Sequence, residues 1–153
     1  MLYSPVLSIS RFIFLLFWVI VIIPFHAIWS LINKKHFFFS FNLFFKGLVN
    51  IFGIKINFIG KPELRDTLFI SNHISYLDIF MLGSKLKAIF VAKKEIKSWP
   101  LINKISLLGK TIFVNRSSIF DIKTQMNVIS KNLKKGFNIV LFPEGTSSDG
   151  SRV

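Results

Sequence analysis

The sequence contains no cysteine, and it has only three histidines and seven acidic residues among 153 positions. Without a thiol, the chain can form no disulfide, no cysteine-based metal site and no thiolate nucleophile, which also fits a reducing compartment. The histidines His26, His36 and His73 lie far apart in the sequence, which argues against a zinc site completed by carboxylates.

Acidic residues are scarce beside 20 lysines and arginines, which gives a formal net charge of +13. Such a charge attracts either nucleic acid or an anionic membrane surface. We expect no nucleic-acid partner, because the aromatic residues concentrate in the apolar front half and do not interleave with basic residues. Lys34, Lys35 and Lys46 adjoin apolar runs, which favours anionic lipid headgroups. A solvated basic face without a partner is the alternative.

The apolar residues are concentrated at the N-terminal end of the chain. Hydrophobic residues make up 52% of the sequence, and the first 58 residues hold 12 of its 19 phenylalanines. All seven acidic residues lie at Glu63 or beyond. Phe12–Asn33 contains 22 residues without a charge, bounded by Arg11 and Lys34. A helix of this length is long enough to cross the hydrocarbon core of a bilayer, with a kink near Pro24.

A cleaved signal peptide is the competing interpretation, because Arg11 and the apolar stretch to Ile23 are typical of its first two regions. No small-x-small cleavage site follows, so we favour a retained anchor. A second, interrupted apolar stretch, Phe37–Phe45 and Leu48–Ile54, predicts an interfacial or re-entrant helix packed against the first. Residues 1–53 are therefore predicted as a membrane-anchoring helix or helix pair, either spanning the bilayer or dipping into one leaflet. The lysines after the first run predict that the rest of the chain is cytoplasmic.

From residue 54 onward the pattern is that of an α/β domain, which we assign to residues 54–153. Short apolar or alternating runs between turn residues predict strands. These runs are Ile54–Phe58, Thr67–Ile70, Ala88–Ala92, Ile112–Val114 and Asn138–Phe142. Because helical segments alternate with these strands, we expect a mixed sheet covered by helices.

Two helices are predicted in this domain. Tyr76–Leu82 begins one after the second strand. In Ile119–Leu133 the apolar residues recur at steps of three and four, which is typical of a helix with one buried face. Ser118 and Asp121 are spaced as a capping box at its start, and Gly136 is expected to end it.

The first candidate for chemistry follows the Thr67–Ile70 strand, at the kind of strand end where open α/β sheets place their sites. His73 is followed five residues later by Asp78. If the intervening turn enters a helix, the carboxylate can hold one imidazole nitrogen, which leaves the other able to take a proton from an alcohol. The alternative is a structural or solvated pair, with Asp78 serving only the dipole of the following helix.

Two further segments follow predicted strands. After Asn138–Phe142, Gly145 allows close backbone approach, and Glu144 and Thr146 offer polar groups to a ligand, although an ordinary strand-to-loop exit has the same composition. Arg116 follows the Ile112–Val114 strand. Its guanidinium can donate two parallel hydrogen bonds to a phosphate, although a single arginine is most often a surface charge.

Taken in order, these segments resemble the glycerolipid acyltransferase family, which includes 1-acylglycerol-3-phosphate acyltransferases. The family's Asn-His, four residues and Asp is matched by Asn72–Asp78. Its glycine, short apolar strand and arginine are matched by Gly109–Arg116, and its Phe-Pro-Glu-Gly-Thr by Phe142–Thr146. The segment Phe90–Ile96 is also similar to the family's sequence between the first two blocks, and the resemblance extends over residues 58–150.

The resemblance implies an enzyme that moves an acyl group from acyl-CoA or acyl carrier protein to the hydroxyl of lysophosphatidic acid, forming phosphatidic acid. His73 would be the general base and Asp78 would orient it. The acceptor would be bound by Asn72, Arg116, Glu144, Gly145 and Thr146. No metal and no cofactor beyond the acyl donor is implied, and the partners would be membrane lipids, the lysolipid and the donor.

Two departures from the family pattern bear on these expectations. Ser147 stands where the third block often has arginine, which leaves open a lysolipid with another headgroup, such as a lyso-ornithine lipid. The sequence stops at Val153, shortly after that block, so we expect an incomplete domain and weak or no activity for these 153 residues alone.

The alternative to an enzyme is a non-catalytic basic membrane protein.

Overall fold

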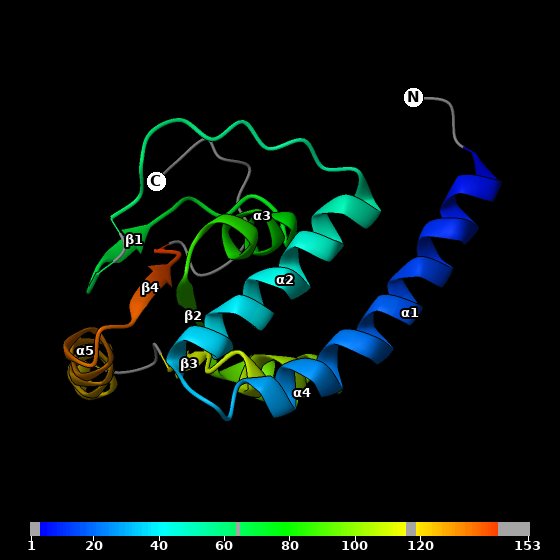
Figure 1. Ribbon diagram of the computed structural model, residues 1–153. Coiled ribbons are helices and arrows are strands. Elements are labelled where there is room, and N and C mark those ends of the chain that lie inside the picture. The colour runs from blue at the N-terminus through cyan, green and yellow to red at the C-terminus, as the bar shows by residue number, and fades with distance from the viewer. Residues whose placement is uncertain (1–3, 64, 116–118, 144–153) are drawn as a thin grey trace. The chain divides into compact units, whose positions relative to one another are not determined.

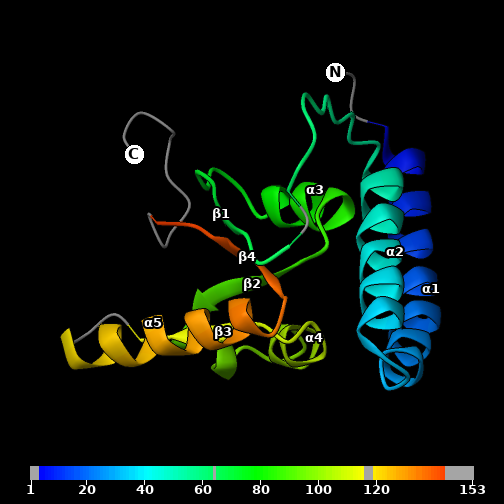
Figure 2. The ribbon, with the colours of Figure 1, turned by 60° about the vertical axis from the view of Figure 1, so that its left-hand side comes forward.

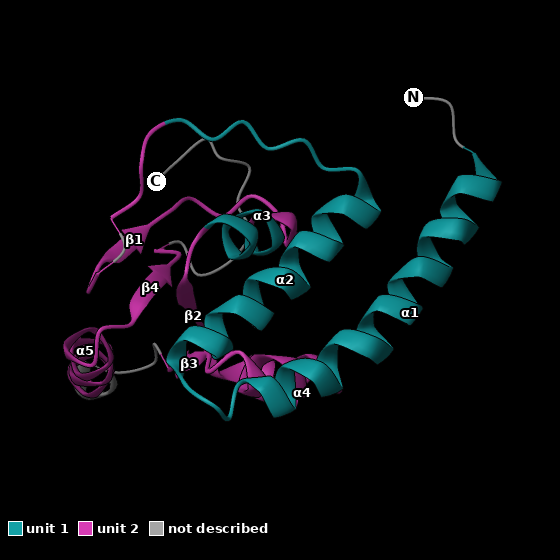
Figure 3. Ribbon diagram, viewed as in Figure 1, with its two compact units in different colours: residues 1–59, 79–85 teal, residues 60–78, 86–153 magenta. Residues whose placement is uncertain are grey.

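The computed structural model describes residues 4–63, 65–115 and 119–143 and divides into two compact units (Figures 1 and 3). One unit comprises residues 1–59 and 79–85, and the other comprises residues 60–78 and 86–153. The division passes through helix α3 (Leu77–Lys85), after its first two residues.

The first unit is built on an antiparallel pair of helices, α1 (Pro5–Trp29) and α2 (Lys34–Phe52), which lie side by side (Figures 1 and 2). Ser4 begins α1 by accepting the Leu7 N–H on its hydroxyl, and Asn33 begins α2 by accepting the His36 N–H at 3.1 Å. Gly53 ends α2 with a φ of 67°, a left-handed conformation that glycine adopts without steric cost.

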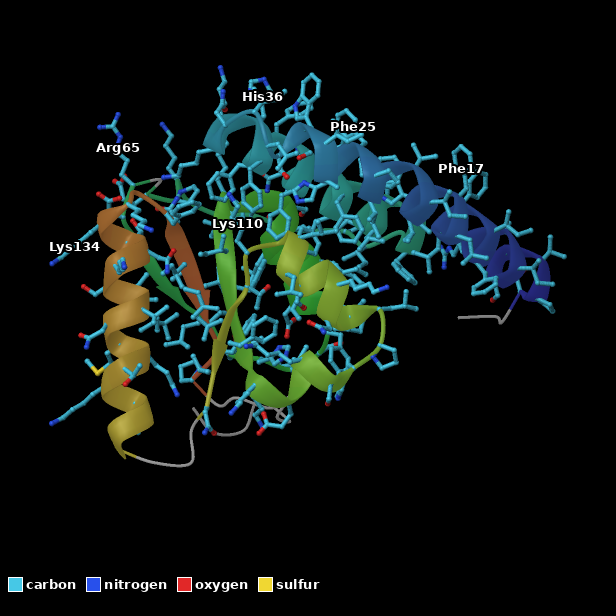
Figure 4. The ribbon with its side chains drawn as sticks, turned by 90° about the horizontal axis from the view of Figure 1, so that it is seen from below. Phe17, Phe25, His36, Arg65, Lys110 and Lys134 are labelled. Carbon is cyan, nitrogen blue, oxygen red and sulfur yellow. The ribbon has the colours of Figure 1, made fainter. Side chains whose placement is uncertain are left out.

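Helix α1 exposes most of its apolar side chains along its length. Phe17, for example, is 64% exposed and points away from the helix (Figure 4). By length and composition α1 can cross a membrane, and its apolar surface indicates membrane association. The helix begins before the predicted Phe12 and continues through Pro24.

The predicted second apolar stretch is a single helix, because α2 runs without a break through Lys46 and Gly47. The indole of Trp18 lies against Gly47, where a Cβ would overlap it, and its Nε1–H donates to the Phe44 carbonyl at 3.1 Å. The glycine that suggested a break is therefore a contact point between α1 and α2.

Polar groups also join elements within this unit. His26 Nδ1 of α1 lies 2.6 Å from the Ser40 hydroxyl of α2, and both side chains are buried. The amide of Asn42 donates to the Gly83 carbonyl of α3 at 2.5 Å. Buried polar groups of this kind need such partners, because water is excluded from them.

The second unit contains a four-stranded sheet with the order β1-β4-β2-β3. Its strands are β1 (Leu68–Ile70), β2 (Ala88–Lys93), β3 (Ile112–Val114) and β4 (Asn138–Leu141). The helices that connect them include η1 (Lys94–Ser98), α4 (Ile102–Leu108) and α5 (Ile119–Lys134). Helix α5 packs against β3 and β4. The core of the sheet lies in its two central strands, where Ile89, Ile139 and Val140 are almost completely buried.

The α/β class is confirmed, but the expected mixed sheet is parallel at every described pairing, with Phe69 and Phe90 both in register with Val140. Helical segments connect successive strands, and such crossovers return the chain in the same direction. The prediction of a strand at Ile54–Phe58 was wrong, because this segment has no strand partner. Helix α4 was not predicted, because its seven residues are too few for a clear helical period.

Candidate active site

The candidate site lies at the edge of the sheet where the parallel strands end. Ile70, the last residue of β1, is in register with Leu141, the last residue of β4. The Ser71 N–H donates to the Leu141 carbonyl at 3.2 Å, which extends this pairing by one residue. His73 and Phe142 therefore leave the sheet at the same edge, where open parallel sheets usually bind their ligands.

A tight turn between β1 and α3 brings Asp78 to His73. Asp78 Oδ2 lies 3.1 Å from His73 Nδ1 and accepts the backbone N–H groups of Ile74 and Ser75 at 2.8 and 2.9 Å. The Ser75 hydroxyl accepts the Leu77 N–H at 3.2 Å. The side chains of Ser75 and Asp78 thus both cap the start of α3, because the first accepts the Leu77 N–H and the second accepts the Ser75 N–H.

The imidazole of His73 is held by its ring face as well as by its edge. The ring of Phe142 stacks on it with centroids 4.3 Å apart and planes 24° apart, and Tyr76 approaches edge-on at 6.5 Å. The side chains of His73 and Asp78 are 11% and 18% exposed. Both side chains are therefore largely buried and keep a small exposed fraction.

The contact of His73 Nδ1 with Asp78 determines which ring nitrogen can accept a proton. An ionised carboxylate only accepts hydrogen bonds, so Asp78 holds the proton of His73 on Nδ1 and leaves the lone pair on Nε2. Among the residues that the structure describes, none is hydrogen-bonded to Nε2. Nε2 can thus accept a proton from an incoming hydroxyl, which is the role of a general base.

Of the other predicted site residues, the structure describes Asn72. Asn72 is exposed and precedes His73 at the strand end. Arg116, Glu144, Gly145 and Thr146 lie outside the described residues, as do the predicted cap residue Ser118 and the substituted position Ser147. Of the third block, the structure describes Phe142 and Pro143.

Three residues at this edge were not predicted as parts of the site. Lys93 ends β2 and Lys94 follows it, so both lie on the same edge as His73, one strand beyond Phe142 in the order β1-β4-β2. The sequence signal was the lysine pair after an apolar strand, within the family-like segment Phe90–Ile96. Phe142 begins the third sequence block, Phe142–Thr146, but its stacking on His73 depends on the pairing of β1 with β4.

The described residues include no group of three His, Asp or Glu side chains placed to hold a metal ion. The donors that the described part of the site offers are an imidazole, a carboxylate and basic side chains. Such groups suit proton transfer and the binding of anions.

A histidine–carboxylate pair at the carboxyl edge of a parallel sheet is an arrangement suited to proton transfer. The profile of the family described as Acyltransferase matches residues 55–153, and the chain belongs to this family. The resemblance inferred from the motifs is thereby confirmed at the level of the family.

Two relatives illustrate the similarity. A lyso-ornithine lipid O-acyltransferase of Rhizobium meliloti (strain 1021) is 38% identical over 104 residues, which are 67% of this chain and 36% of the relative. A 1-acyl-sn-glycerol-3-phosphate acyltransferase of Neisseria gonorrhoeae is 40% identical over 95 residues, which are 60% of this chain and 37% of the relative. The matched part of the chain thus spans less than half the length of these curated relatives.

The fold is similar to a solved structure. The crystal structure of the 1-acyl-sn-glycerophosphate (LPA) acyltransferase from Thermotoga maritima superposes with a TM-score of 0.69 and 21% sequence identity. The alignment covers 96% of this chain and 66% of that chain. The likeness shows that the N-terminal helices and the sheet together belong to a known fold.

Proposed function

We propose that this protein is the acyltransferase part of an enzyme that moves a fatty acyl group from a thioester to the free hydroxyl of a lysolipid. The single observation that carries the proposal is the His73–Asp78 pair at the carboxyl edge of the sheet. A carboxylate on Nδ1 and an Nε2 without a described partner are the arrangement that general-base catalysis requires. Membership of the Acyltransferase family supports the same reaction class.

In the proposed reaction, His73 Nε2 takes the proton of the lysolipid hydroxyl while the hydroxyl oxygen attacks the thioester carbonyl. The carbon–sulfur bond then breaks, and the imidazolium returns its proton to the leaving thiolate. Asp78 fixes the ring orientation and stabilises the imidazolium. The acyl group passes directly between substrates, so the mechanism needs no cysteine, which this chain lacks.

Lysophosphatidic acid is the acceptor that we propose first, with phosphatidic acid as the product. Lys93 and Lys94 lie at the site edge, and a phosphate headgroup would suit their positive charge. Asn72, Arg116, Glu144, Gly145 and Thr146 remain the predicted contacts to the headgroup and glycerol region.

A lyso-ornithine lipid is the second candidate acceptor. Ser147 replaces the arginine that often follows the third block, so one source of phosphate affinity is absent from this position. The relative in Rhizobium meliloti is named for this acceptor. The ester-forming chemistry of His73 is the same for both candidates.

The donor is acyl-CoA or acyl carrier protein, both of which are acidic and suit a chain with a net charge of +13. We propose that residues 1–53 anchor the protein and that residues 54–153 form its catalytic part. The lysines after α1, Lys34 and Lys35, support a cytoplasmic position for the catalytic part.

The proposal is tested by supplying the complete gene product, in membranes, with labelled acyl-CoA and each acceptor in separate reactions. We expect labelled phosphatidic acid from lysophosphatidic acid, above a control without acceptor. Preferential labelling of ornithine lipid would replace the first acceptor with the second. No transfer to either acceptor, from either acyl-CoA or acyl carrier protein, would contradict the proposed reaction.

A further inference from the structure

A strained turn lies between η1 and α4. Leu101 has φ 65° and ψ −53°, and the Ile102 N–H donates to the Pro100 carbonyl at 2.8 Å across it. This is the γ-turn with positive φ, which is rare and strained. A leucine in such a conformation is unfavourable, whereas glycine would adopt it more easily.

The strained turn presents apolar side chains to solvent. Leu101 is 73% exposed, and its neighbours Trp99 and Ile102 are 43% and 45% exposed. Burial within the fold therefore does not offset the cost of the turn. We call residues 99–102 the γ-turn tip. A tip that holds a leucine outward at a conformational cost is suited to a partner that buries it.

Basic residues flank the γ-turn tip on both sides. Lys94 and Lys97 precede it on η1, and Lys104 follows it on α4. Glu95 is the one acidic residue in residues 94–104. Lys97 also lies over the ring of Phe113 at 5.0 Å, which steadies η1 on the sheet. The surface around the tip thus combines exposed apolar groups with an excess of positive charge.

We propose that the γ-turn tip inserts into the interface of an anionic bilayer, as an attachment of this chain additional to α1. Tryptophan favours the level of the lipid headgroups, aliphatic side chains enter the acyl region, and lysines pair with anionic headgroups. The tip and its flanking residues supply all three. The same chain also carries α1, which is apolar enough for a bilayer, so the proposed surface is available to the protein.

The absence of cysteine allows a direct test with a single spin label. Leu101→Cys labelled with a nitroxide reports on the tip, and Ile102→Cys gives a second reporter. Ser130→Cys is the matched control, because Ser130 is exposed on α5. The full chain is reconstituted in vesicles of equal parts phosphatidylcholine and phosphatidylglycerol, and label access is measured for oxygen and for a water-soluble nickel complex.

We expect the tip labels to lose nickel access several-fold relative to Ser130→Cys and to gain oxygen access, with a smaller effect in pure phosphatidylcholine. Equal nickel access at the tip and at residue 130 would overturn the proposal. Shielding by added acyl carrier protein in detergent, without shielding in vesicles, would also overturn it, because the partner would then be an acidic protein. Label access is measured without catalytic turnover, so the result does not depend on whether the proposed reaction is correct.

Discussion

At the scale of single residues, the site depends on the carboxylate of Asp78. One oxygen, Oδ2, faces His73 Nδ1 and two backbone N–H groups, those of Ile74 and Ser75. The same atom therefore fixes the imidazole and closes the turn that leads into α3. Loss of its charge should affect the turn as well as the proposed chemistry.

We expect Asp78→Asn to destabilise the protein by about 1–3 kcal/mol, because hydrogen bonds to a charged acceptor are lost or weakened. Thermal unfolding in detergent, followed by circular dichroism, measures this change. Asp66→Asn is the matched control, since Asp66 is exposed at a φ of 53° that asparagine also tolerates. Equal unfolding temperatures for Asp78→Asn and the wild type would contradict the assigned role of the carboxylate.

Local geometry explains why the approach of His73 to Asp78 could be predicted from sequence. Four residues lie between them, and a turn that enters a helix is enough to bring the side chains together. The stacking of Phe142 on His73 could not be predicted in this way, because it depends on the pairing of β4 beside β1. The position of Lys93 at the same edge depends likewise on the strand order.

At the scale of elements, a buried asparagine joins three strand ends. Asn138, at the start of β4, accepts the Thr67 N–H at 3.2 Å and donates to the Lys87 carbonyl at 3.1 Å. Thr67 precedes β1 and Lys87 precedes β2, so one side chain ties both neighbours to the central strand. A β-branched apolar residue would have better strand propensity but could make neither bond.

We expect Asn138→Val to lower stability by about 1–3 kcal/mol, because the Thr67 N–H and the Lys87 carbonyl, both in part-buried bonds, lose their partner. The same change at exposed Asn127 of α5 should stay within about 0.5 kcal/mol. Thermal unfolding of both variants compares the two sites. Similar effects at the two positions would show that the two bonds of Asn138 contribute little.

The helix pair of the first unit depends on close approach at a glycine. Gly47→Ala would place a methyl group against the indole of Trp18 and displace its bond to the Phe44 carbonyl. We expect a loss of about 1–3 kcal/mol from overpacking. In a Trp18→Ala background the substitution should cost little, because the clash is gone. An equal cost in both backgrounds, measured by thermal unfolding, would contradict this packing.

The elements that were predicted correctly have strong local signals, and those that were not depend on partners. Helix α5 follows from its apolar period, and β4 from its continuous apolar run. The alternation at Ile54–Phe58 has the pattern of a strand, but no neighbouring strand pairs with it. The direction of each strand pairing is set by the chain connections, which a pattern of apolar residues does not reveal.

At the scale of the whole molecule, the exposed apolar surface of α1 is the strongest indication of a lipid environment. Residues such as Val6, Phe14 and Ile20 are at least 62% exposed, and the candidate span is near the N-terminus. A surface of this kind in water would drive aggregation. We expect the protein to remain with membranes after a wash in alkaline carbonate and to be released by detergent. Release by carbonate alone would contradict a membrane-embedded α1.

The proposed role of His73 as the general base of acyl transfer is tested by removing its imidazole. The measurement is the rate of acyl transfer from labelled acyl-CoA or acyl carrier protein to the preferred acceptor, by the complete gene product in membranes. We expect His73→Ala to lower this rate by about 10²–10⁴-fold. His36→Ala, which removes a histidine that contacts Asn33 on α2's first turn, should leave it close to the wild-type value. Equal rates for the wild type and His73→Ala would contradict the account.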